Sequence, residues 1–114
     1  MRKLSKDEAR LLEVLIKKAS VTLTYNLQED LDVETMNDDG MGSLKLFPKD
    51  ISGDNRVFGK QVAECMFFDE DGVNVIASLN VDDKGKIFEL DVWKTDFSPL
   101  IKIPEKLSKI KNGK

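Results

Sequence analysis

Two carboxylates, Glu89 and Asp91, stand two residues apart in a stretch that alternates apolar and polar residues. On a strand they point to the same face, and a rise of about 3.3 Å per residue sets the carboxyl groups roughly 6–7 Å apart. Such a pair could act as acid and base on a glycosidic bond. It could also bind a basic residue of a partner, with Trp93 beside it as an apolar or cation–π anchor. A third interpretation is structural: a polar sheet face with a half-buried tryptophan.

The remaining composition favours binding over catalysis. The chain contains no histidine, so the commonest general base and metal ligand is missing. Cys65 has no histidine to activate it and lies among apolar residues, where a thiol usually packs. Ser43, Ser78 and Ser98 also lack a base. A chain of 114 residues leaves little room for a sugar cleft. We therefore expect a protein that is not an enzyme and that uses no cofactor.

The acidic loops are typical of turns and do not match known ligand motifs. Residues 37–43 (NDDGMGS) contain two glycines and a serine, but Asp38 and Asp39 would repel a phosphate, and no lysine follows at the P-loop position. The same segment lacks the twelve-residue calcium pattern and its terminal glutamate. The acidic runs at 69–71 and 82–83 are of the kind from which hairpin turns are built. The sequence predicts no metal site.

Charge is segregated along the chain. Residues 19–101 carry seventeen carboxylates against seven basic side chains, while residues 1–18 have a net charge of +3 and residues 102–114 a net charge of +4. A body this acidic attracts cationic partners and repels phosphates and anionic membranes. We expect a basic protein partner, no nucleic acid and no membrane surface.

Length and cysteine usage predict one cytoplasmic domain. A chain of 114 residues lies within the size range of single domains. The lone Cys65 cannot close an intrachain disulfide, which suits a reducing compartment. The sequence has neither the apolar core of a signal peptide nor a run long enough to span a membrane. The lysine-rich residues 105–114 are expected to form a flexible tail.

The first predicted element is a helix. Ser5 and Glu8 match the capping-box pattern, with Leu4 placed for the hydrophobic staple. An apolar stripe at helical spacing follows: Leu11, Leu12, Leu15, Ile16 and Ala19. Residues 20–35 are ambiguous, because apolar residues alternate as in a strand over 21–27, while Leu23, Leu27 and Leu31 also fit one helical face. We expect a short second helix or an irregular segment there, followed by a strand from about residue 31. Strands are predicted at 31–36 and 43–47, the second ended by Pro48.

Residues 56–94 predict a three-stranded antiparallel meander. Two four-residue turns that end in glycine, DEDG at 69–72 and DDKG at 82–85, separate three apolar segments. We expect Phe68 to pair with Val73 and Leu79 to pair with Phe88. The helix would then cover Val62, Met66 and Phe68, with Glu64 as the single polar intruder. The opposite face would carry Ala63, Cys65, Phe67, Ile76, Ser78, Asn80, Glu89, Asp91 and Trp93.

The segment after the meander is expected to turn back on the core. Asp96-Phe97-Ser98-Pro99-Leu100 reads as a tight turn followed by an extended segment, since the residue before proline is disfavoured in a helix. Phe97 and Leu100 are apolar and are predicted to pack on the core. That arrangement would leave Asp96 at the rim of the face that carries Trp93.

Three blocks of the sequence, residues 38–44 (DDGMGSL), 67–73 (FxDxDGV) and 88–100 (FELDVWKxDFSPL), resemble a family of small bacterial proteins of unknown function. The resemblance covers residues 4–104, and it implies no catalytic residue. Small acidic proteins of this build are also similar, as a class, to immunity proteins of contact-dependent and other polymorphic toxin systems. Those proteins inhibit a cognate toxin, often a nuclease, by tight binding.

The sequence therefore predicts an α+β domain, with an N-terminal helix packed on an antiparallel sheet of four to six strands that ends in a β-meander. We expect a non-catalytic acidic binding protein, in its most specific form an immunity-type inhibitor that occludes a basic toxin domain. One alternative is a structural or adaptor module. Another is a small ligand binder or enzyme, which requires an enclosed pocket lined by both Glu89 and Asp91. The expected partner-binding residues are Glu89, Asp91, Trp93, Asp96, Asp38 and Asp39.

Overall fold

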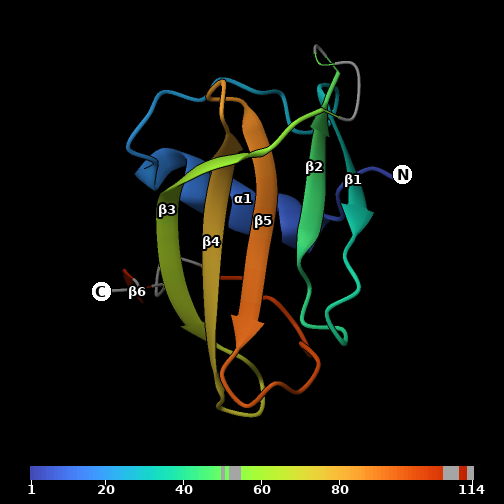
Figure 1. Cartoon of the computed structure of the whole chain (residues 1–114). Coiled ribbons are helices and arrows are strands. Elements are labelled where there is room, and N and C mark those ends of the chain that lie inside the picture. Colours follow the sequence, from blue (N-terminus) through green and yellow to red (C-terminus); the bar gives the residue numbers. More distant parts are fainter. Residues whose placement is uncertain (50, 52–54, 107–110, 113–114) are drawn as a thin grey trace.

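The computed structural model describes residues 1–49, 51, 55–106 and 111–112. One N-terminal helix packs on an antiparallel sheet, which confirms the predicted α+β fold (Figure 1). The elements are α1 (Lys6–Lys18), β1 (Leu31–Thr35), β2 (Leu44–Pro48), β3 (Phe58–Phe68), β4 (Asn74–Asp82), β5 (Ile87–Lys94) and the two-residue β6 (Lys111–Asn112). Their order across the sheet is β1-β2-β5-β4-β3-β6. Among the described residues, no helix is long and apolar enough to cross a membrane.

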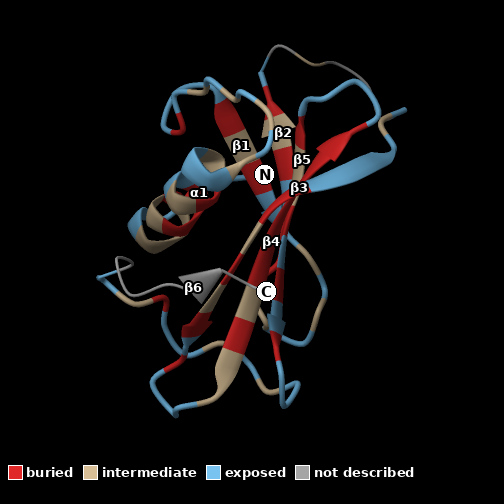
Figure 2. Ribbon diagram, turned by 90° about the vertical axis from the view of Figure 1, so that its left-hand side faces the viewer, coloured by how far each residue is buried: buried red, intermediate tan, exposed pale blue. Residues whose placement is uncertain are grey.

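The helix α1 begins with the predicted capping box. The Ser5 hydroxyl accepts a hydrogen bond from the Glu8 N–H at 3.1 Å, and the Glu8 carboxylate accepts one from the Ser5 N–H at 2.8 Å. These bonds satisfy N–H groups that the first turn of a helix leaves unpaired. The fully buried side chains of the apolar stripe, Leu11, Leu12 and Leu15, belong to the core, and α1 packs on β3 and β4. In Figure 2 the helix covers one face of the sheet.

Residues 19–30 join α1 to β1 without a second helix. The Asn26 side chain accepts hydrogen bonds from the N–H groups of Gln28 and Glu29, which closes a turn in place of a helix. The irregular alternative is therefore correct and the short helix is wrong. The strand that follows begins at Leu31, as predicted. Leu27 is buried, and three further residues are half-buried against the core: Val21, Leu23 and Tyr25.

The hairpin between β3 and β4 differs from the predicted register by one residue. The Asp69 N–H donates to the Val73 carbonyl at 3.0 Å, so the loop has three residues, 70–72, and not four. Gly72 closes it with a left-handed φ of +79°. A shift of one residue moves every side chain of a strand to the other face. The β3 residues on the helix side are therefore Ala63, Cys65 and Phe67, and those facing away are Glu64, Met66 and Phe68, the reverse of the prediction.

The register between β4 and β5 differs from the predicted register by two residues, so the side chains of β5 lie on the predicted faces. The Asp82 N–H donates to the Lys86 carbonyl at 2.8 Å, so the loop has three residues, 83–85, and not the expected four. Phe88 is then an extra residue in a bulge, so that Leu79 pairs with Leu90. A displacement of two leaves the alternation of side chains unchanged. The residues that face away from α1, as predicted, are Glu89, Asp91 and Trp93.

Arg56 connects β2 to β5 by side-chain hydrogen bonds. It does so beyond the two residue pairs at which these strands are paired. The segment that carries it crosses in front of β5 and β4 on its way to β3 (Figure 1). Its guanidinium donates to the carbonyls of Leu46, at 2.8 Å, and Ile87, and its Nε donates to the Asp82 carboxylate at 2.9 Å. It also lies 5.1 Å from the centre of the Phe88 ring. The arginine thus bonds strand carbonyls where the bulge interrupts the ladder.

The chain returns after β5 to the N-terminal helix. The Arg10 guanidinium donates to the carbonyls of Ile103 and Pro104 at 3.2 and 3.0 Å, and Ile103 is buried. The predicted flexible tail, 105–114, falls largely outside the described residues. Of those described there, residues 105 and 106 are exposed, and the backbone of β6 pairs with β3.

Candidate functional site

The sheet face turned away from α1, which we call the open face, carries large apolar side chains at the end of β5. Trp93 pairs with Ile76 on β4, and Ile76 pairs with Met66 on β3, so these three side chains form a row across the sheet. Trp93 is 42% exposed, and Phe68 and Phe97 are 54% and 66% exposed. Large apolar side chains that gather on a surface mark interaction sites. We call Met66, Phe68, Ile76, Trp93 and Phe97 the aromatic patch.

Phe97 does not pack on the core, and that prediction was wrong. Its ring lies 6.0 Å from the Trp93 ring, centre to centre, at an interplanar angle of 46°. Its backbone has a φ of +63°, a left-handed conformation that costs a bulky residue about 1–3 kcal/mol. The Phe97 N–H donates to the Lys94 carbonyl at 2.8 Å, which holds the loop in this shape. Leu100, by contrast, is half-buried against the core, as predicted.

Asp96 stabilises the same loop. One carboxylate oxygen accepts hydrogen bonds from the Ser98 hydroxyl at 2.6 Å and from the Ser98 N–H at 3.0 Å. These bonds favour the charged form and lower the pKa of Asp96 below its ordinary value. The prediction that Asp96 lies beside the Trp93 face agrees with the contact between Trp93 and Phe97, the residue next to it. Asp96 is therefore a charged, exposed residue next to the aromatic patch.

A row of polar residues borders the aromatic patch. Asp91 pairs with Ser78, and Ser78 pairs with Glu64, so two carboxylates occupy the open-face row next to the row of Trp93. Asp91 is exposed and Glu64 is half-buried. Asp96, which precedes Phe97 in the chain, adds a third carboxylate beside the patch. We call Asp91, Glu64 and Asp96 the acidic rim.

Ser43 connects two of the predicted site residues. Its N–H donates to the Asp38 carboxylate at 2.9 Å, and its hydroxyl lies 3.3 Å from the Asp91 carboxylate. The same hydroxyl accepts a hydrogen bond from the Val92 N–H at 2.8 Å. Asp38 is thereby tied into the loop and is half-buried, whereas Asp39 is exposed with a φ of +59°. The structure brings Asp38 and Asp91 together through this serine.

Glu89 lies apart from the aromatic patch, beside a hollow of about 390 Å³. Its carboxylate accepts a hydrogen bond from the Asn80 side chain at 3.1 Å. The hollow is lined by Met1, Glu34, Lys45, Phe47, Arg56, Phe88 and Glu89, and Asp91 is not among these residues. The enzyme alternative required one pocket lined by both carboxylates, and this hollow does not meet that requirement.

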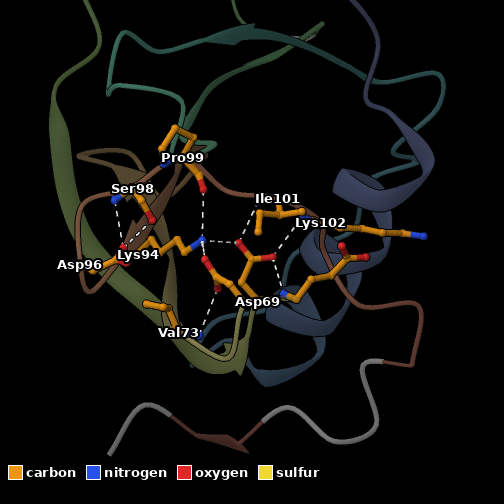
Figure 3. A network of polar contacts seen from close by, with 10 residues as sticks. Asp69, Val73, Lys94, Asp96, Ser98, Pro99, Ile101 and Lys102 are labelled. Carbon is orange, nitrogen blue, oxygen red and sulfur yellow. Dashed lines mark hydrogen bonds and ion pairs between the residues drawn. The ribbon is translucent and has the colours of Figure 1, made fainter.

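A buried ion-pair network lies beneath the loop of Phe97 (Figure 3). The fully buried Lys94 ammonium donates to the carboxylates of Asp69, at 2.9 Å, and Asp71, at 2.6 Å, and to the Pro99 carbonyl at 3.2 Å. Burial lowers the pKa of Lys94, but the hydrogen bonds and charges of the two aspartates outweigh that effect, and the net shift is upward. Lys94 stays charged, and it fixes both ends of residues 95–98, the loop that displays Phe97.

Cys65 does not form part of the open face. It is fully buried on the helix side, and burial raises the pKa of its thiol to about 11. A thiol in this state is neither a nucleophile nor a metal ligand at neutral pH. Within the described residues, no group of three or more cysteine, aspartate or glutamate side chains is arranged to hold a metal ion.

Sequence reasoning misplaced three members of the aromatic patch, Met66, Phe68 and Phe97, and one member of the acidic rim, Glu64. The first two were placed under the helix by the register error in β3. The signal that could have corrected it was Glu64, which the predicted register left as a carboxylate on the apolar face. Phe97 gave no comparable signal, because an apolar side chain after a strand normally packs inward.

The three sequence blocks noted above meet at this end of the molecule. The Leu100 N–H donates to the Gly40 carbonyl at 3.0 Å, and a Cβ added at Gly40 would lie 3.3 Å from the Pro99 side chain. Lys94 connects the last block to Asp69 and Asp71 of the second. The blocks therefore build one structural unit around the aromatic patch.

Comparison with curated proteins and with solved structures gives no match. A family model does match, over residues 1–104, and its description is Domain of unknown function (DUF6984). The match spans α1, β1 to β5 and the return segment, and thus contains all three blocks. The chain belongs to this family of domains of unknown function.

Proposed function

We propose that the protein is a non-catalytic binding protein that uses the aromatic patch and the acidic rim to dock a basic protein partner. The observation that carries the proposal is the exposed Trp93–Phe97 pair, held on a scaffold of strand and ion-paired loop. Tryptophan and other aromatic anchors supply much of the energy of protein interfaces. A loop already fixed by Lys94 loses little conformational entropy when a partner binds.

Charge supports a basic partner. The rim residues Asp91, Glu64 and Asp96 border the patch, and residues 19–101 carry ten more carboxylates than basic groups. Such a surface accelerates the association of a cationic protein, and this acceleration becomes weaker as salt is added. It opposes the binding of nucleic acid, whose phosphates carry the same sign of charge.

The specific form of the proposal is an immunity-type inhibitor. In this form the partner is a basic toxin domain, such as a nuclease, and the chain neutralises it by covering its active surface. A nuclease presents cationic groups to hold the phosphate backbone, and these are the groups that the acidic rim would occupy. An adaptor that binds without inhibition is the alternative form of the same docking function.

The proposal is tested by cross-linked capture from the native cell, followed by binding measurements with the purified partner. The test variant is Asp91→Lys/Asp96→Lys. The matched control, Glu13→Lys/Asp83→Lys, makes the same change in charge at exposed positions on α1 and at the other end of β5. We expect the wild type and the control to bind one basic protein with similar Kd, and the test variant to bind it at least about tenfold more weakly.

Equal affinity of the test variant and the wild type for that purified partner would refute the assignment of this surface. Inhibition of a toxic activity of the partner identifies the immunity form, and binding without inhibition identifies the adaptor form. Turnover of a small molecule by the chain itself would refute the non-catalytic assignment.

A further inference from the structure

We infer that the aromatic patch recognises an arginine of its partner in preference to a lysine, with the guanidinium stacked on Trp93 and hydrogen-bonded to Asp91. This inference rests on the proposed function and names the side chain that the docking surface accepts. Three observations support it: a matching arrangement inside the same molecule, the geometry of the patch, and the state of the chain's own arginines.

The matching arrangement lies at the other end of β5. There the Arg56 guanidinium lies 5.1 Å over the Phe88 ring, and its Nε donates to the Asp82 carboxylate at 2.9 Å. One aromatic ring and one carboxylate, together with the Leu46 and Ile87 carbonyls, thus hold a guanidinium against this strand. An arginine suits such a site because its planar, charged group stacks on a ring while it donates in the ring plane.

The patch presents the same two components to solvent. Trp93, whose indole is the best ring for a cation, is 42% exposed, and Asp91 stands two residues earlier on the same face of β5. The Asp91 carboxylate has a long contact of 3.3 Å with the Ser43 hydroxyl, which leaves it capacity for further donors. A lysine ammonium could pair with Asp91, but it has no plane to stack on the indole.

A different protein is a better source of this arginine than a second copy of the chain. The chain has three arginines, and each is engaged internally: Arg2 with Glu8 at 2.7 Å, Arg10 with Asp7 at 2.8 Å, and Arg56 with Asp82 at 2.9 Å. A second copy of this chain could supply a guanidinium only by breaking one of these ion pairs. The patch therefore fits a partner of another sequence better than it fits self-association.

The test compares two probe peptides, one with five arginines alternating with glycine and its twin with five lysines. Trp93 is the single tryptophan, so its fluorescence reports binding at the patch. For the variant that lacks Trp93, calorimetry measures peptide binding instead. We expect the arginine peptide to bind the wild type about five- to tenfold more tightly than the lysine peptide. The preference should disappear in Trp93→Leu and in Asp91→Asn. It should persist in Asp83→Asn, which removes one carboxylate at the far end of β5.

Equal affinity of the two peptides, or a preference that survives in Trp93→Leu, would overturn the inference. After either result, the proposed function still holds if Asp91→Lys/Asp96→Lys binds the native partner more weakly than the wild type does. That partner would then dock through lysines. Loss of rim dependence with the native partner overturns the proposed function, whatever the peptides do. The two failures are therefore distinguishable. Trp93, Asp91 and Asp83 are all exposed, so these variants should fold, which circular dichroism verifies.

Discussion

The Lys94 ammonium lies 2.9 Å from the Asp69 carboxylate, and both side chains are shielded from solvent. The two partners are not equivalent. Asp69 also accepts hydrogen bonds from the backbone N–H groups of Glu70 and Ile101, both at 2.7 Å, and of Lys102 at 3.0 Å. The carboxylate thus joins the β3–β4 hairpin, the end of β5 and the return segment, whereas Lys94 contacts it from one side.

Removal of Asp69 should therefore cost more stability than removal of Lys94. Asp69→Ala leaves a buried ammonium with a weakened set of partners and three partly buried backbone N–H groups without this acceptor, and we expect a loss of about 3 kcal/mol in the free energy of unfolding. Lys94→Met leaves the carboxylate with its three backbone donors, so the loss should be smaller. Urea denaturation measures both. Glu70→Ala, an exposed change in the same turn, is the control with almost no effect. A larger loss for Lys94→Met would contradict this ranking.

Two buried aspartates, Asp69 and Asp82, should contribute to a loss of stability in acid. Burial raises the pKa of Asp69 and Asp82, but the hydrogen bonds that each carboxylate accepts outweigh it and hold both pKa values below the ordinary 3.8. A carboxyl group whose pKa is lower in the folded state stabilises the fold above its unfolded pKa, and this contribution is lost as the pH falls through the folded value. The free energy of unfolding should be nearly constant above about pH 5 and should drop below about pH 4.

The Asp82→Asn variant gives the control for this pH dependence. It should be less stable than the wild type at pH 7 and should show a shallower decline toward pH 3, because one carboxylate whose pKa is lowered by folding is gone. Urea denaturation at several pH values measures both slopes. An unfolding free energy of the wild type that stays constant between pH 5 and pH 2 would contradict the role of these carboxylates.

Arg56 should control local opening between β2 and β5. Its guanidinium bonds the Leu46 and Ile87 carbonyls, so Arg56→Met leaves both without this donor and also removes the ion pair of the buried Asp82 carboxylate. We expect a loss of about 2–3 kcal/mol and faster hydrogen exchange in residues 44–48 and 87–90 than in the β3–β4 hairpin. Lys60→Met, at an exposed position of β3, is the matched control. Uniform acceleration across the sheet would contradict a local role.

The elements that the sequence predicted correctly depend on local interactions. The capping box at Ser5 and Glu8 and the leucine stripe specify α1 within a few turns, and the turn residues place both hairpins. Glu89, Asp91 and Trp93 were assigned to the correct face because an error of two residues preserves alternation. The composition also indicated an acidic surface, and two of the rim residues, Asp91 and Asp96, are exposed carboxylates.

The parts that could not be predicted depend on the exact loop length and on distant contacts. A three-residue and a four-residue loop both end at Gly72, and only the pairing of Asp69 with Val73 distinguishes them. The exposed position of Phe97 follows from Lys94, which is held by Asp69 and Asp71 from another hairpin. No local pattern encodes that contact. The aromatic patch was therefore only partly visible in the sequence.

The register of β3 can be tested through its cysteine. Cys65 is fully buried, and its thiol pKa rises from 9.0 to about 11, chiefly through burial. At pH 8 this shift alone reduces the thiolate fraction about 100-fold, and burial also blocks the reagent. Alkylation by iodoacetamide, followed by mass spectrometry, should therefore be at least about 100-fold slower in the native protein than in urea.

The neighbouring position gives the control for this register. Met66 lies on the open face and is half-buried, so in a Cys65→Ser background the Met66→Cys variant should be alkylated in the native state far faster than wild-type Cys65. A four-residue loop at 69–72 would reverse the two outcomes, because each residue would then occupy the other face. Rapid native alkylation of Cys65 together with protection of the cysteine at 66 would refute the observed register, and with it the membership of Met66 and Phe68 in the aromatic patch.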